Sequence, residues 1–156
     1  MKCVLDSNIL IDLNNGNILA GLFELPLDIT APDAVLDELV EPSRSALYQL
    51  GLHSITLTSA QVIEAALLQA SDPRISLGDA SALTAAQYEG ALLLTGDKRL
   101  RDKAAAVSLP THGVLWVLDS LEDAGLLHST ELATSLRLML DAGARLPAEE
   151  CKTRFQ

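Results

Sequence analysis

Three aspartates stand where the chain is expected to leave a strand or enter a helix. Asp6 directly follows an apolar run at residues 2–5, Asp97 follows a second run at 91–95 after one glycine, and Asp79 lies in the first turn of a predicted helix. Carboxylates that meet in one pocket raise each other's pKa unless a cation is present. Oxygen ligands of this kind suit Mg²⁺ or Mn²⁺. If these side chains converge, the sequence predicts a divalent-cation site.

Each aspartate also has a purely structural interpretation. Asp6 and Asp97 are both placed to cap the helices that follow them. Asp79 completes a Ser-x-x-Asp capping pattern with Ser76, and negative charge is favoured at the start of any helix. Taken one at a time, the three residues are therefore explained as helix caps, and only their convergence in space favours chemistry.

A fourth acid is expected within the helix that follows the second strand. The apolar positions 35, 36, 39 and 40 form one face of that helix. At about 100° per residue, Asp37 and Glu38 flank this face on opposite sides at similar angles. Helical periodicity therefore does not decide which of the two carboxylates turns toward the other acids.

Short apolar runs alternate with amphipathic segments along the chain, which predicts an α/β fold. Such alternation implies right-handed crossovers and a parallel sheet covered by helices on both faces, with ligands bound at the carboxyl ends of the strands. The predicted strands lie at residues 2–5, 27–30, 54–57, 91–95 and near Thr111. The predicted helices lie at residues 7–14, 18–23, 43–50, 59–71, 76–89 and 98–107, with another that starts at Thr30-Ala31-Pro32-Asp33 and runs to about Val40, and two or three within 114–155.

Length and composition set the broad class of protein. The 156 residues fit one domain, with a core at about 1–112 and a helical C-terminal part at about 113–156. A hydrophobic share of 49% argues against disorder, and the net charge of −10 argues against binding nucleic acid or anionic membranes by charge alone. The apolar runs are too short for a transmembrane helix, and the acid at position 6 comes too early for a signal peptide. Because Cys3 and Cys151 read as reduced thiols, we expect a cytoplasmic protein.

One stretch opposes the acidic balance of the chain. Lys98, Arg99, Arg101 and Lys103 place four of the eleven basic residues within six positions, directly after Asp97. They could form a solvated helix face, or one or two of them could contact a phosphate, since not all four can face the same way on one helix.

The sequence resembles the PIN domain family in four acidic motifs, in the same order and with fitting spacing. These motifs are VLDSNILI at 4–11, PDAVLDEL at 32–39, LGDASAL at 77–83 and LLTGDKRL at 93–100. The tail, with HGVL at 112–115, AGLL at 124–127 and GARLP at 143–147, resembles the helical end of small prokaryotic members. The likeness spans nearly the whole chain.

The resemblance implies a three-layer α/β/α sandwich with a central, mostly parallel sheet of about five strands and a helical C-terminal end. It also implies an Mg²⁺- or Mn²⁺-dependent endoribonuclease, similar to the VapC toxins of toxin–antitoxin pairs, that leaves a 5′-phosphate and a 3′-hydroxyl. By position in the motifs, Asp6, Glu38, Asp79 and Asp97 would bind the metal and carry catalysis, and the family pattern selects Glu38 over Asp37.

The same resemblance suggests residues and partners around this quartet. Asn8 and Thr95 fall beside the motifs and could support the site, although both could equally be capping or turn residues. Asn8, Thr95, Lys98, Arg99 and Arg101 are the expected substrate contacts, with Arg74 as a further candidate. The implied partners are an RNA substrate, a cognate antitoxin and a second copy in a homodimer. Apolar helix faces at 43–52 and 59–70 permit such a dimer.

Three other functions are compatible with parts of this sequence. The chain could be a ribonuclease of RNA processing with no antitoxin, or a catalytically silent domain that acts by binding another protein. The presence of all four acids disfavours the silent domain. A Rossmann-type nucleotide binder is disfavoured because no Gly-x-Gly-x-x-Gly follows the first strand, and Asp6 stands where that loop should begin.

Overall fold

A five-stranded parallel sheet forms the centre of the molecule. The structure is a computed structural model that describes residues 1–147 and 150–151. The strands are β1 (Lys2–Leu5), β2 (Asp28–Pro32), β3 (His53–Ile55), β4 (Leu92–Leu94) and β5 (Thr111–His112), in the spatial order β3-β2-β1-β4-β5. Every pair of neighbouring strands is parallel. The predicted α/β fold is therefore confirmed, with a sheet that is wholly parallel.

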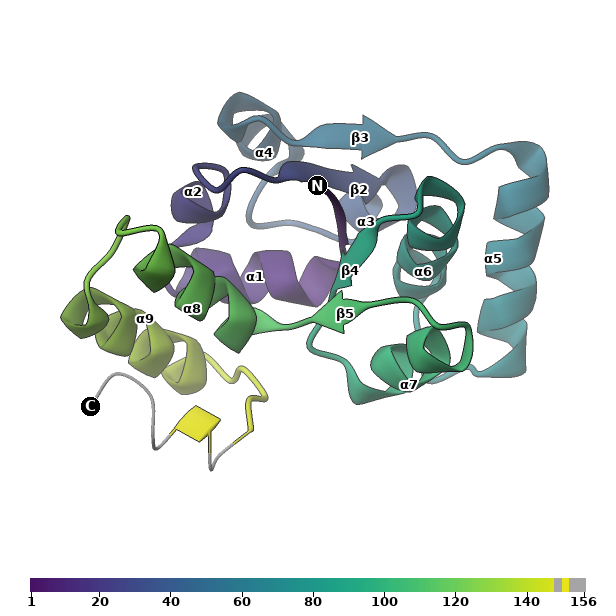
Figure 1. Cartoon of the computed structure of the whole chain (residues 1–156). Helices are drawn as coiled ribbons and strands as arrows, with labels where there is room; N and C mark the ends of the chain where they lie inside the picture. Colours follow the sequence, from purple (N-terminus) through teal and green to yellow (C-terminus); the bar gives the residue numbers. More distant parts are fainter. Residues whose placement is uncertain (148–149, 152–156) are drawn as a thin grey trace.

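Helices cover both faces of the sheet (Figure 1). On one side lie α1 (Ser7–Asn15), α2 (Leu19–Leu22), α8 (Val114–Asp123) and α9 (Ser129–Asp141); on the other lie α3 (Asp33–Asp37), α5 (Ser59–Ser71), α6 (Leu77–Glu89) and α7 (Lys98–Ala106), while α4 (Arg44–Leu50) lies near β3. The predicted three layers and helical C-terminal end are both present. Among the described residues, no helix is long and apolar enough to span a bilayer.

The packing of the central strands follows from their composition. Cys3, Val4 and Leu5 of β1 and Leu93 and Leu94 of β4 are fully buried. Strands of a parallel sheet bury both faces, so they read as continuous apolar runs rather than as alternating patterns. The two strands therefore form the middle of the hydrophobic core, and their carboxyl ends deliver Asp6 and Thr95 to one edge of the sheet.

Small side chains let α6 lie between the sheet and an outer helix. This helix contacts β1, β2 and β4 on one side and α5 on the other. Nine consecutive residues of α6, from Gly78 to Ala86, are buried, and they are Gly, Asp, Ala, Ser, Leu or Thr. Because few of these side chains are bulky, the backbone of α6 can approach both neighbours closely. The N-terminal turn of α6, which contains Asp79, is thereby fixed against the sheet.

Two expectations around the second strand are wrong. Thr30 does not start a helix: it lies within β2, and its hydroxyl donates a 2.7 Å hydrogen bond to the carbonyl of Cys3 in β1. The helix α3 begins at Asp33 and ends at Asp37, well before Val40. The strand continues to Pro32 because it pairs with β3 as well as β1, and these ladders outweigh the local capping signal.

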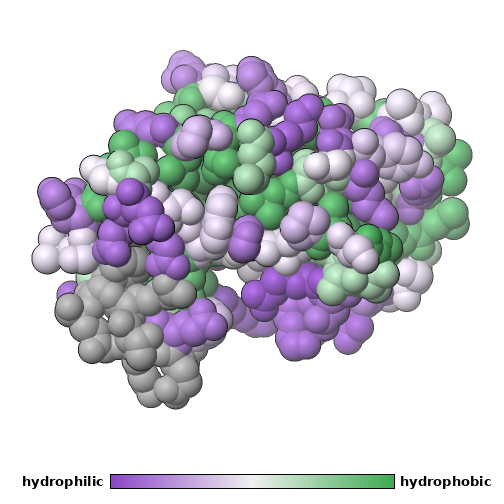
Figure 2. Space-filling model, in the orientation of Figure 1, coloured by the Kyte–Doolittle hydropathy of each residue, from purple (hydrophilic) through white to green (hydrophobic). Residues whose placement is uncertain are grey.

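The apolar stripe of α5 is exposed, although helical periodicity favours its burial. Val62, Ile63 and Leu67 are 51%, 59% and 65% exposed, and only Ala65 of this helix is buried. The helix packs on α6 through a different face. In Figure 1, α5 lies at the right margin of the molecule, and Figure 2 shows hydrophobic surface at this margin. The helix expected at residues 59–71 is therefore present, and the described residues leave its apolar stripe uncovered.

Candidate active site

Asp6 lies at the buried centre of the acidic cluster. It follows β1 and caps α1: its Oδ1 accepts a 2.9 Å hydrogen bond from the backbone N–H of Ile9. Its Oδ2 accepts a hydrogen bond from the hydroxyl of Thr95. Burial raises the pKa of Asp6 to about 7, these two hydrogen bonds act in the opposite direction, and the negative charges of Asp79 and Asp97 raise the pKa further. The carboxylate is therefore held in place, but its ionised form lacks a compensating charge.

Thr95 connects the ends of β1 and β4. This residue is fully buried directly after β4, and its hydroxyl oxygen also accepts a 3.1 Å hydrogen bond from the backbone N–H of Asp97. Asp97 in turn caps α7, because its Oδ1 accepts a 2.8 Å hydrogen bond from the backbone N–H of Arg99. One hydroxyl group thus fixes the Asp6 carboxylate relative to the turn that carries Asp97.

Asp79 reaches the same edge of the sheet from the first turn of α6. It forms the predicted capping box: the backbone N–H of Asp79 donates to Oγ of Ser76, and the N–H of Ser76 donates to Oδ2 of Asp79, each at 3.0 Å. Burial raises the pKa of Asp79, and the negative charges of Glu38 and Asp97 raise it further, while the hydrogen bonds from Ser76 lower it. The capping role and the proximity of other acids therefore coexist.

Glu38, and not Asp37, faces the other acids. It is the residue after the last turn of α3, so the expectation that it lies inside a helix is wrong. Its Oε2 accepts a 3.0 Å hydrogen bond from the Ser7 hydroxyl, and its Oε1 accepts a 2.8 Å hydrogen bond from the backbone N–H of Gly78. Asp37 points elsewhere and forms an ion pair with Arg44. Helical periodicity did not decide between Asp37 and Glu38, whereas these contacts turn Glu38 toward the other acids.

The four acids share one neighbourhood but do not form a preassembled coordination shell. The negative charge of Asp97 acts on both Asp6 and Asp79, and that of Glu38 acts on Asp79. Within the described ranges, none of the four forms an ion pair. In the same part of the chain, no three acidic, histidine or cysteine side chains are placed to hold one ion between them.

The donor chemistry of this neighbourhood nevertheless fits a hydrated divalent cation. All four donors are hard carboxylate oxygens, and Mg²⁺ usually binds proteins through one or two carboxylates while it keeps several waters. Burial and, to a lesser degree, repulsion by neighbouring acids raise the pKa values of Asp6 and Asp79, and added positive charge would favour the ionised form of both. A cation that keeps several of its waters would therefore suit this set of donors.

A cleft of about 1080 Å³ adjoins Asp97. Of the expected substrate contacts, Asn8, Lys98, Arg99 and Arg101 line this cleft, whereas Thr95 is buried against Asp6. Lys98 forms an ion pair with Asp102 on the same helix. Figure 2 shows hydrophilic side chains gathered over α7 at one margin of this hollow. The basic run therefore lies beside the acids, and its members differ in whether an ion pair already occupies their charge.

Four residues near the site have roles that sequence reasoning missed. Ser7 and Gly78 donate hydrogen bonds to Glu38, and a Cβ atom on Gly78 would lie only 2.5 Å from the Glu38 carboxylate. Asp72 is buried between Arg74 and Lys103, and Arg145 lines the cleft from the C-terminal segment. A glycine in a helical first turn, where it is a poor helix former, was a usable signal of close approach. No local sequence pattern indicated that Asp72 or Arg145 would lie near the site.

The family comparison agrees with the sequence motifs. A family model described as PIN domain matches residues 2–156. No curated protein matches the chain in sequence. Among solved structures, VapBC2 from Rickettsia felis bound to a DNA fragment from its promoter is similar, at 19% identity and a TM-score of 0.45, over 72% of this chain and 98% of the matched one.

Proposed function

Because the chain belongs to the PIN domain family, we propose that it is a metal-dependent ribonuclease whose active site consists of Asp6, Glu38, Asp79 and Asp97. PIN domains are generally nucleases. One observation carries the assignment: four carboxylates from separate segments lie at the carboxyl edge of the sheet, with mutual repulsion and no ion pair within the described residues. Acids in that state favour a divalent cation, for which Mg²⁺ and Mn²⁺ are the candidates.

The contacts of each acid suggest its role in hydrolysis of an RNA phosphodiester bond. A divalent cation bound here would lower the pKa of water and neutralise charge on the phosphate. Asp6 is the central ligand, because hydrogen bonds from Ile9 and Thr95 fix both of its oxygens. Asp79 and Asp97 are held by caps beside it and complete the set.

Glu38 has the contacts of a residue that orients water. Its two oxygens are fixed by the Ser7 hydroxyl and the Gly78 N–H, and each oxygen retains a lone pair for a further donor. We assign it to holding the attacking water or to binding the cation. Hydrolysis by such water needs no side-chain nucleophile, and the expected products carry a 5′-phosphate and a 3′-hydroxyl.

The test is a ribonuclease assay with matched substitutions. Purified wild-type protein should cleave single-stranded RNA in Mn²⁺ or Mg²⁺ and lose activity in EDTA. Asp6→Asn and Glu38→Gln should each lower the rate by about 100-fold or more, because even indirect supports of metal sites are worth 10- to 100-fold. Asp37→Asn is the control, since this neighbour of Glu38 faces Arg44 and should retain activity.

Two outcomes of this assay would contradict the proposal. Equal activity of the wild type and Asp6→Asn would point to a contaminating nuclease. Equal silence of both would favour the alternative that the domain acts only by binding a protein, which the lack of a preassembled three-carboxylate set among the described residues makes worth testing.

We further propose that the ribonuclease is the toxin of a toxin–antitoxin pair. The support is the similarity of its four motifs and tail to small prokaryotic members of this kind. Expression should arrest growth of a bacterial host, Asp6→Asn should abolish the arrest, and the product of a small adjacent gene should relieve it. A ribonuclease of RNA processing would cleave RNA in vitro without such a neutralising partner. Homodimer formation through an apolar helix face stays a prediction, to be measured by analytical ultracentrifugation.

A further inference from the structure

The cleft beside the acids concentrates positive charge in an acidic protein. Six of the eleven basic residues of the chain line it, against four of its twenty-one acids. The basic residues are Arg74, Lys98, Arg99, Arg101, Lys103 and Arg145. The whole chain carries a net charge of −10, so the balance of charge in this cleft is opposite to that of the chain. A local excess of cations in a concave surface attracts anions, whatever the net charge.

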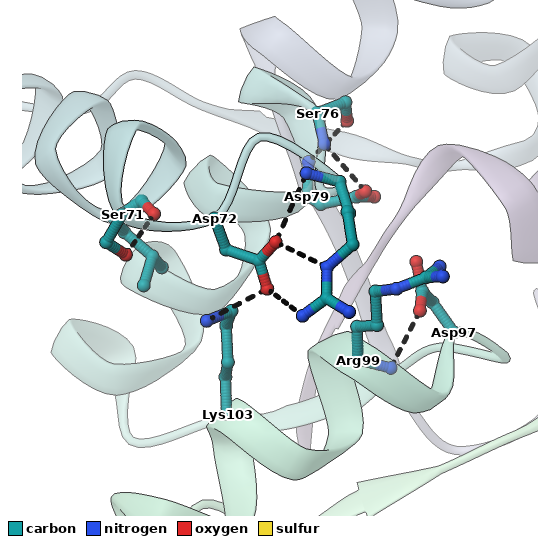
Figure 3. A network of polar contacts seen from close by, with 9 residues as sticks. Ser71, Asp72, Ser76, Asp79, Asp97, Arg99 and Lys103 are labelled. Atoms are coloured by element: carbon teal, nitrogen blue, oxygen red, sulfur yellow. Dashed lines mark hydrogen bonds and ion pairs between the residues drawn. The ribbon is translucent and has the colours of Figure 1, made fainter.

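Two of these cations, Arg74 and Lys103, are paired with a buried carboxylate. Asp72 is 7% exposed, and its Oδ1 and Oδ2 accept hydrogen bonds from Nε and Nη2 of Arg74 at 2.8 and 3.0 Å. Lys103 of α7 adds an Nζ–Oδ2 ion pair of 3.4 Å. Figure 3 shows Asp72 in this network, with Asp79 and Asp97 drawn nearby. The loop before α6 is thus tied to α7, and the guanidinium of Arg74 is fixed along one edge.

The rest of the Arg74 guanidinium is available to a ligand. The side chain is 65% exposed and lines the cleft. Of the five N–H donors of an arginine, Asp72 takes two, and the others have no partner among the described residues. An arginine anchored by a carboxylate has already lost rotamer freedom on folding, so it loses less when it binds an anion.

Arg145 lines the cleft from the C-terminal segment that follows α9. After α9, Gly143 adopts a φ of +98°, and the chain turns back so that residues 143–147 form a wall of the cleft. The N–H of Ala144 bonds to the carbonyl of Met139 at 2.9 Å, and Leu146 packs against the core. The backbone that carries Arg145 is therefore fixed. Within the described residues, Arg145 forms no ion pair.

We propose that this cleft is the binding track for the phosphodiester backbone of single-stranded RNA, with Arg74 and Arg145 as phosphate contacts on two of its walls. The proposal rests on the ribonuclease function proposed above. Asp97 and Asn8 line the same cleft, so a strand that presents its scissile phosphate to the acids continues directly into it. Each further nucleotide brings one negative charge to a surface that supplies cations. Asp72 acts as a positioning residue for Arg74.

The first test measures RNA binding apart from cleavage. The Asp6→Asn protein, with Mg²⁺ present, is titrated against a fluorescent single-stranded RNA of about twelve nucleotides and followed by anisotropy. Arg74→Gln and Arg145→Gln should each raise the dissociation constant by about five- to tenfold and lower the salt slope of binding by about 0.7. Arg137→Gln is the matched control, because this exposed arginine of α9 lies outside the cleft and loses the same charge.

Several results would overturn the assignment. The first is a change in dissociation constant for Arg74→Gln and Arg145→Gln that is no larger than that for Arg137→Gln. The second is the absence of RNA binding by the Asp6→Asn protein. The third is competition by polyglutamate as effective as that by unlabelled RNA, which would indicate a site for acidic peptides. Far-UV circular dichroism and the melting temperature verify that each variant is folded.

A double-mutant cycle tests the anchoring role of Asp72. Asp72→Asn removes a negative charge, so charge alone predicts tighter RNA binding by this variant. If Asp72 positions Arg74, the loss of RNA affinity caused by Arg74→Gln should be clearly smaller in protein that carries Asp72→Asn than in protein that retains Asp72. Equal costs in both backgrounds would overturn the positioning role.

Cleavage kinetics separate this inference from the proposed function. In protein with all four acids intact, Arg74→Gln and Arg145→Gln should raise KM for RNA while they change kcat little. A wild type that cleaves RNA, with both variants at unchanged KM, contradicts the track and leaves the ribonuclease intact. A wild type that does not cleave RNA at all contradicts the ribonuclease proposal itself.

Discussion

The hydroxyl of Thr95 donates a hydrogen bond to the carboxylate of Asp6, a residue 89 positions away in the sequence. Both residues are fully buried, and they follow neighbouring parallel strands, β4 and β1. The same hydroxyl oxygen accepts the N–H of Asp97. This residue therefore sets the relation between two of the four acids without contributing a carboxylate.

Removal of the Thr95 hydroxyl should weaken metal binding. In Thr95→Val, the Asp6 carboxylate loses a donor that lowers its pKa, so more of it is protonated at neutral pH. We expect a loss of Mn²⁺ affinity of about tenfold in titration calorimetry, because hydrogen-bonding supports of metal ligands are typically worth 10- to 100-fold. Thr95→Ser should largely restore the affinity.

Thr84→Val is the control for that experiment. Thr84 is also a buried threonine, but its hydroxyl donates to the carbonyl of Ala80 within its own helix. Its substitution should leave Mn²⁺ affinity unchanged. An equal loss in both variants would mean that Thr95 acts only through general packing.

The pKa of Asp6 predicts how the stability of the metal-free protein depends on pH. Burial raises this pKa from 3.8 to about 7 in the folded state. The unfolded chain therefore releases the proton more readily, and the stability associated with protonated Asp6 is lost as pH rises through about 7. The melting temperature of metal-free protein should fall between about pH 5 and about pH 8, and it should fall less in Asp6→Asn.

Mn²⁺ should reverse this trend. A cation that binds the ionised carboxylates of the folded state stabilises it by mass action, so added Mn²⁺ should raise the melting temperature at about pH 8 more than at about pH 5. Differential scanning fluorimetry at both values, with and without EDTA, measures the effect. A melting temperature that rises with pH in EDTA, in parallel for wild type and Asp6→Asn, is incompatible with a buried neutral Asp6.

Gly78 is predicted to be required by Glu38 rather than by its own helix. A Cβ at this position would lie 2.5 Å from the Glu38 carboxylate, so Gly78→Ala must displace that side chain. RNA cleavage should fall by at least about tenfold. In a Glu38→Ala background the added methyl meets no carboxylate, and alanine should then stabilise α6 by about 0.5–1 kcal/mol in urea unfolding. Retained activity in Gly78→Ala would show that the position of Glu38 does not matter.

The contacts beneath α5 and its exposed face should differ sharply in their contribution to folding, as Ile75 of the loop before α6 and Leu67 of α5 can show. Ile75 is 1% exposed and packs with Ala65 and Ala80 beneath this helix, so Ile75→Ala should cost about 2–5 kcal/mol of unfolding free energy. Leu67 is 65% exposed, and Leu67→Ala should change that free energy by less than about 0.5 kcal/mol. A large loss in Leu67→Ala, dependent on protein concentration, would indicate that another chain covers this helix.

Patterns along the sequence predicted the architecture well where a segment had one dominant local signal. The apolar runs that became β1 and β4 bury both faces, and the helix at 59–71 has the bounds of α5. Local patterns failed where a tertiary contact decided the outcome. Thr30 resembles a helix cap, yet its hydroxyl donates a hydrogen bond to the carbonyl of Cys3 in the neighbouring strand.

The candidate site divides in the same way. The positions of Asp6, Asp79 and Asp97 at strand ends and helix starts were evident from their neighbours in sequence. The resemblance to the family selected Glu38 over Asp37, whereas helical periodicity could not, because the orientation of Glu38 depends on its contacts with Ser7 and Gly78. Arg145 could not be foreseen, because its place in the cleft depends on the turn after α9 and on the path of the whole chain.

The capping roles of Asp6, Asp79 and Asp97 constrain how this protein can lose its chemistry. A mutation of Asp6 or Asp97 to a residue without a side-chain acceptor removes an N-cap, at about 1 kcal/mol each, together with the carboxylate. A mutation of Asp79 removes the carboxylate half of the capping box in which Ser76 is the N-cap. Asparagine is the exception, because it caps a helix as well as aspartate does but carries no charge. An inactive descendant should therefore drift first toward Asn at these positions, which keeps the scaffold intact for a partner that binds it.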